Sequence, residues 1–89
     1  MDIKIDDIIQ DIANSSYSFG KVVKIVQVKN HYQIWCWWAG TLTDLIDGRY
    51  INRINGLMYC TYNRSIIVIK RANENLNPKE KYKYLFENA

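Results

Sequence analysis

Residues 21–39 constrain the fold more than any other part of the chain. Residues 21–29 are rich in β-branched side chains, which favour a strand over a helix, and residues 32–39 are also predicted to form a strand. Asn30-His31 lies between the two runs and is a candidate turn. We therefore expect an antiparallel pair of strands joined by this turn.

Alternation along the second strand divides its side chains between two faces. The even positions form the more apolar face, which consists of Tyr32, Ile34, Cys36 and Trp38. The odd positions form a mixed face, which consists of Gln33, Trp35, Trp37 and Ala39. Because neighbouring side chains of a strand point to opposite faces, Trp37 and Trp38 cannot enter the same core layer. Trp37 is the better candidate for a functional surface, although a tryptophan of this face beneath a helix would be simple core.

Three further strands are predicted over residues 49–54, 57–62 and 65–71. Asn55-Gly56 between the first two is a strong hairpin signal. Asn63-Arg64 is a second turn, so these strands should form a meander. Residues 66–69 are apolar at every position, which favours a central place in the sheet.

The segment of residues 41–48 fits two structures. Leu42, Leu45 and Ile46 have helical spacing, with Thr41 as a candidate cap, and this favours a short helical turn. The alternative is a hairpin turn at Asp47-Gly48.

Helices are predicted at both ends of the chain. The first has an apolar stripe at helical spacing, formed by Ile5, Ile8, Ile9, Ile12 and Ala13. At the other end, Asn77 and Pro78 are typical of a helix start, and residues 79–87 should dock on the sheet. The expected fold is a single α+β domain over residues 1–89: an N-terminal helix, a four- to five-stranded antiparallel β-meander and a C-terminal helix.

Signatures of catalysis, metal binding and cofactor binding are missing from the sequence. His31 is the only histidine, and no glycine-rich phosphate loop is present. Cys36 and Cys60 are expected to be reduced core residues. The acidic start of the chain lacks the pattern of a secretory signal, and no apolar run has the length of a membrane span. We therefore expect a cytoplasmic protein that is not an enzyme, uses no cofactor and does not enter membranes.

The net charge of +3 conceals an uneven distribution. Residues 1–14 carry −3, residues 15–72 carry +6, and residues 73–89 are neutral. The basic block also holds all three tryptophans, and arginine, tryptophan and tyrosine dominate the hot spots of protein interfaces. The predicted partner-binding residues are Trp35, Trp37, Arg49, Tyr50, Arg53 and Arg64.

Composition suggests a source and hence a class of function. Isoleucine, asparagine, lysine and tyrosine, whose codons are A/T-rich, supply 37 of 89 residues, which is typical of a low-GC genome. A small chain of this kind fits the accessory proteins of phages and mobile elements. We expect a non-catalytic protein that binds and blocks a host protein or ribonucleoprotein complex, for example a CRISPR effector. The alternatives are binding of single-stranded nucleic acid by the same surface and homodimerisation through an exposed edge strand.

Overall fold

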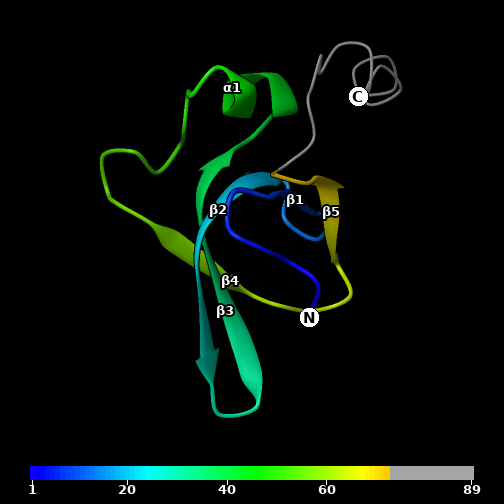
Figure 1. Ribbon diagram of the computed structural model, residues 1–89. Helices are drawn as coiled ribbons and strands as arrows, with labels where there is room; N and C mark the ends of the chain where they lie inside the picture. The colour runs from blue at the N-terminus through cyan, green and yellow to red at the C-terminus, as the bar shows by residue number, and fades with distance from the viewer. Residues whose placement is uncertain (73–89) are drawn as a thin grey trace.

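The computed structural model describes residues 1–72 (Figure 1). These residues form an antiparallel sheet with strand order β4-β3-β2-β1-β5 and one short helix. The elements are β1 (Ile8–Asp11), β2 (Phe19–Val28), β3 (His31–Ala39), α1 (Leu42–Ile46), β4 (Met58–Thr61) and β5 (Ile66–Lys70). The expected antiparallel sheet combined with helix is confirmed. The helix predicted over residues 79–87 lies outside the described residues.

The predicted hairpin of β2 and β3 forms and is the longest pairing in the sheet (Figure 1). Its turn lies at Lys29 and Asn30, one residue earlier than the predicted Asn30-His31, because Lys29 adopts a left-handed φ of 50° and His31 already pairs in β3. The register shifts between Val22 and Lys24, which marks Val23 as a β-bulge. Because an extra residue reverses the alternation, the bulge brings Lys24 to the same face as Lys21.

The N-terminal helix predicted around Ile5 to Ala13 is wrong, because residues 8–11 form β1 between β2 and β5. Ile8 and Ile9 are both buried, one on each face of the sheet, as only a strand with cover on both sides allows. Ile5 and Ile12, which the helical stripe would bury, are 47% and 62% exposed. Their spacing matched a helix by coincidence.

A buried carboxylate fixes the segment before β1. Asp7 is 1% exposed and accepts hydrogen bonds from the backbone N–H groups of Lys4, at 2.9 Å, and Ala72, at 3.0 Å. Its Oδ2 also lies 2.9 Å from Nη1 of Arg71. The start of the chain is therefore tied to the end of β5.

β5 corrects two further predictions. It pairs with β1 rather than with β4, so the last strands are not a meander, and it lies at an edge of the sheet rather than at its centre. Its Ile67 is 42% exposed, which the apolar sequence did not indicate. Cys60 of β4 and Val68 of β5 nevertheless pack against the same buried cluster, so the sheet curls around that cluster.

The two faces of the curled sheet carry separate cores. The inner core consists of Ile3, Ile9, Val22, Ile34, Cys36, Trp38 and Ile66. Gly20 is required there, because a Cβ at this position would lie 2.9 Å from the Trp38 ring. The outer core consists of Ile8, Ala39, Leu42 and Leu45, and α1 supplies the two leucines. The helical turn preferred for residues 41–48 is therefore confirmed, with Thr41 as its N-cap.

The strand predicted over residues 49–54 and its Asn55-Gly56 hairpin are wrong, because residues 49–57 form a loop. Asn52, 1% exposed, holds this loop against β3. Its Oδ1 accepts a hydrogen bond from the backbone N–H of Trp38 at 2.8 Å. Its Nδ2 donates to the backbone carbonyls of Cys36, at 3.1 Å, and Gly56, at 3.0 Å. One side chain thus satisfies β3 groups that a neighbouring strand would otherwise pair.

Candidate binding surface

Two aromatic pairs lie on the outer face of β3. The rings of Trp37 and Tyr50 stack, with centroids 5.6 Å apart and an angle of 13° between their planes. The rings of Trp35 and Tyr59 are tilted by 46°, with centroids 4.8 Å apart. Both tryptophans are half-buried, so their rings are held in place while part of each surface stays accessible.

Each pair has a local structural cause. Trp35 and Tyr59 occupy directly opposed positions of β3 and β4, where side chains on one face meet. Tyr50 comes from the loop that Asn52 anchors, and the neighbouring Ile51 N–H donates to the Trp38 carbonyl at 2.8 Å. The same loop attachment that completes β3 therefore positions the ring that stacks on Trp37.

Two lysines complete this surface from β2. Lys21 is the cross-strand partner of Trp37, and Lys24 is the partner of Trp35. The Lys24 Nζ lies 5.2 Å from the centroid of the Trp35 ring, within range of a cation–π interaction. We call these six residues the aromatic–lysine face, namely Lys21, Lys24, Trp35, Trp37, Tyr50 and Tyr59.

No acidic side chain among residues 1–72 forms an ion pair with the lysines of this face. All ion pairs among residues 1–72 involve Arg49 or Arg71, so neither Lys21 nor Lys24 has an acidic partner in this part of the chain. Both lysines are exposed. Within residues 1–72, the face therefore offers two ammonium groups that no carboxylate pairs, beside four aromatic rings.

The structure unites the predicted aromatic residues but not the predicted arginines. The Arg49 Nε lies 3.0 Å from Oδ1 of Asp44, and its Nη2 lies 2.9 Å from Oδ2 of Asp47, so two carboxylates offset its charge. Arg53 is exposed in the loop of residues 49–57, and Arg64 is exposed in the link between β4 and β5. Within the described chain, neither makes an ion pair or a side-chain hydrogen bond.

Sequence reasoning missed three members of the face. The alternation that exposes Trp37 also indicates Lys21, because the two strands are antiparallel neighbours. Lys24 depends on the bulge at Val23, which no turn residue in β2 announces. Tyr59 depends on the register between β3 and β4, which the incorrect hairpin at Asn55-Gly56 obscured.

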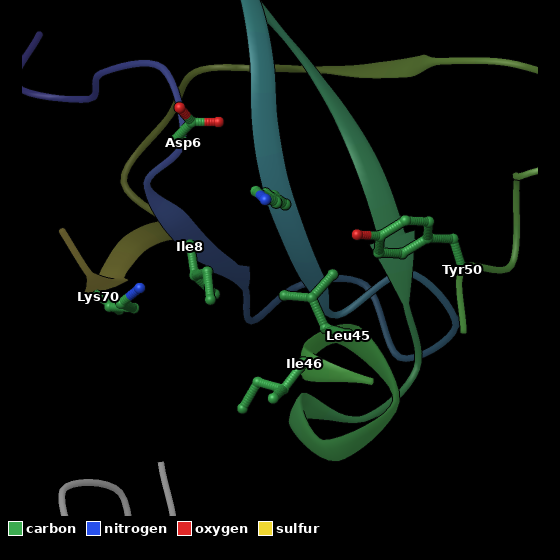
Figure 2. A pocket seen from close by; sticks show the side chains of 7 residues that line it. Asp6, Ile8, Leu45, Ile46, Tyr50 and Lys70 are labelled. Atoms are coloured by element: carbon green, nitrogen blue, oxygen red, sulfur yellow. The ribbon is translucent and has the colours of Figure 1, made fainter. Parts of the chain in front are cut away.

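A hollow of about 330 Å³ adjoins the face (Figure 2). It lies where β1, β2 and β5 meet α1, and its lining residues are Asp6, Ile8, Lys21, Leu45, Ile46, Tyr50 and Lys70. Lys21 and Tyr50 belong to both the hollow and the aromatic–lysine face. The two features therefore form one continuous surface.

The cysteines are poorly suited to nucleophilic chemistry at neutral pH. Both are free thiols, on the inner side of β3 and β4. Burial raises the pKa of Cys36 far above its usual range, and burial followed by the charge of Asp11 raises the pKa of Cys60 to about 11. Among residues 1–72, no cluster of three or more His, Cys, Asp or Glu side chains is arranged to hold a metal ion.

Comparison with protein-family models, curated proteins and solved structures gives no match for this chain. In the portion that the structure describes, no helix has the length and apolar character needed to cross a membrane.

Proposed function

We propose that this chain is a cytoplasmic, non-catalytic binding protein that occupies and blocks a surface of a host protein or ribonucleoprotein complex. The observation that carries the proposal is the aromatic–lysine face, on which two pre-formed aromatic pairs lie beside two lysines that have no acidic partner within residues 1–72. Its partner surface should be acidic and should offer apolar groups to the rings.

The arrangement of the rings favours a protein partner. Tryptophan and tyrosine are the most frequent hot-spot residues of protein interfaces. Because Tyr50 already stacks on Trp37, these rings lose little conformational entropy on binding. The stack also occupies ring surface that a nucleic-acid base would need. Tyr59 of β4 leaves 49% of its area exposed, so this ring of the face is accessible to a partner.

Size and composition support a source for the protein. A chain of 89 residues rich in A/T-encoded residues is typical of accessory proteins from phages and mobile elements of low-GC hosts. Such proteins commonly act by covering a functional surface. We therefore propose a nucleic-acid-handling defence complex, such as a CRISPR effector, as the kind of target.

The Lys24–Trp35 contact supports a second candidate function, binding of single-stranded nucleic acid. A ring that stacks on a base beside an amine that neutralises a phosphate is the usual combination for that task. The salt dependence of the affinity distinguishes the two candidate functions. The affinity for phosphates falls steeply, and linearly on a log–log scale, as the salt concentration rises.

A pull-down from nuclease-treated host lysate tests the proposal. We expect the tagged protein to retain a partner protein, Lys24→Glu to lose it, and Lys29→Glu to keep it. Lys29 is the matched control because it is an exposed lysine in the β2–β3 turn and its substitution changes the net charge equally. Complete loss of binding after nuclease would favour the nucleic-acid candidate. Equal retention by both variants would contradict the role of the face.

A further inference from the structure

We propose that the hollow beside Tyr50 receives a carboxylate side chain, with an apolar neighbour, from the protein partner. This inference rests on the proposed function and adds the chemistry of a second contact. The aromatic–lysine face would engage the partner surface broadly, while the hollow would select an acidic residue. The occupant is thus an acidic peptide segment rather than a phosphate-bearing strand.

Strand register places two amines around one apolar residue. Ile8 of β1 pairs with Lys21 of β2 on one side and with Lys70 of β5 on the other. Adjacent strands are about 4.8 Å apart, so the two lysine backbones stand roughly 10 Å apart. Flexible side chains of this length reach a single carboxylate lying between them.

The floor and wall of the hollow are apolar. Ile8 and Leu45 are 8% and 3% exposed, whereas Ile46 is 40% exposed. Figure 2 shows Ile8, Leu45 and Ile46 between Lys70 and Tyr50. Methylene groups of an acidic side chain and an adjoining apolar residue would contact this floor, where a hydrated phosphate would gain little.

The charge balance matches one carboxylate. Lys21 and Lys70 have no ion pair within residues 1–72, and Asp6 is the one acidic residue among those lining the hollow. The lining therefore carries a net charge of +1, which a single carboxylate neutralises. A multiply charged strand would be repelled by Asp6 after the first contact.

Nuclear magnetic resonance titration of the full chain provides the test. The probe is a soluble Gly–Ser peptide with a central Leu-Glu-Phe, and the comparison peptide carries Leu-Gln-Phe. We expect the Glu peptide to shift the backbone amides of Ile8, Leu45 and Lys70. The Gln peptide, and the Lys70→Gln variant with the Glu peptide, should bind roughly two- to five-fold more weakly, as for loss of one partly exposed ion pair. Lys29→Gln should leave the affinity unchanged.

Several results would overturn the inference. These are equal binding of both peptides, shifts confined to residues outside the hollow, or stronger shifts of the hollow amides with an oligothymidylate than with the Glu peptide. Shifts of the same amides on dilution of the protein alone would identify a second copy as the occupant and would also contradict the proposal.

Failure of this inference can be distinguished from failure of the proposed function. Lys70 is outside the aromatic–lysine face, so the pull-down can be repeated with Lys70→Gln. A partner retained normally by Lys70→Gln but lost by Lys24→Glu would contradict the inference and leave the proposed function standing. If both Lys70→Gln and Lys24→Glu retain the partner normally, the proposed function itself is contradicted.

Discussion

The inner and outer faces of one sheet carry different kinds of side chain. On the inner face, Val22 of β2 and Ile34 and Cys36 of β3 are completely buried. On the outer face, the same β2 and β3 strands present half-buried rings and exposed lysines. Because the side chains of a strand alternate, a single hairpin supplies both core residues that stabilise the fold and the face that we propose as the binding surface.

Two adjacent tryptophans show the difference most clearly. Trp38 is 3% exposed, and its Nε1 donates to the Met58 carbonyl at 2.9 Å, which links β3 to the start of β4. Trp37 instead stacks on Tyr50 at the surface. The same residue type is therefore buried in the core at one position and partly accessible on the outer face at the next.

The largest effect is expected for Trp38→Ala. The substitution removes the ring that fills the space above Gly20 and leaves a cavity, which should cost about 3–5 kcal/mol of the free energy of unfolding. Urea unfolding followed by circular dichroism measures this loss. A change below about 1 kcal/mol would show that the inner face does not stabilise the fold as described.

Asn52→Ala should have the next largest effect. It deprives the Trp38 N–H and the Cys36 carbonyl of their buried hydrogen-bond partner, at about 2–3 kcal/mol of unfolding free energy. The loop that carries Tyr50 should also detach from β3. Chemical denaturation measures the stability, and the Tyr50 side-chain resonances report the stack. An unaltered Tyr50 environment would contradict the anchoring role of Asn52.

Trp37→Ala should separate binding from stability. Loss of the stack with Tyr50 should cost about 0.5–1.5 kcal/mol of stability. Partner binding should weaken by roughly tenfold or more, as at an interface hot spot. Quantitative pull-down and thermal melting of the same variant measure both quantities. A loss of stability as large as that of Trp38→Ala would mean that Trp37 belongs to the core.

The smallest effect is expected for alkylation of Cys60 near neutral pH. With a pKa of about 11, this thiol has roughly 100-fold less thiolate than an unperturbed cysteine of pKa 9. Its reaction with iodoacetamide should be correspondingly slow at pH 7.5 and should accelerate steadily towards pH 10. Mass spectrometry of the labelled peptide measures the rate. Rapid labelling at pH 7.5 would show that the inner side of β4 is open to solvent.

Local patterns predicted the parts of the fold that local chemistry controls. The β2–β3 hairpin, the short α1 and the strands at β4 and β5 follow from alternation, β-branched residues and a capping threonine. Non-local pairing decided the rest. The isoleucines of β1 suit a helical stripe equally well, and the antiparallel pairing of β1 with β2 and β5 makes a strand the better solution.

The sequence indicated part of the candidate site, namely three of its aromatic residues, but not its lysines. Trp35, Trp37 and Tyr50 were identified from alternation and composition, and the structure brings them to one surface. The sequence did not indicate that Arg49 pairs with two carboxylates, because these come together only when α1 and the following turn form. Lys24 was missed because a bulge moves it to the outer face.

Lysine footprinting of the captured complex tests the division between the two faces most directly. The free protein and the complex are acetylated under the same mild conditions, and each lysine is quantified by mass spectrometry. We expect binding to protect Lys21 and Lys24 strongly while Lys29, in the turn at the far end of the hairpin, reacts as in the free protein. Equal modification of Lys21 and Lys24 in both states would contradict the assignment of the outer face as the binding surface.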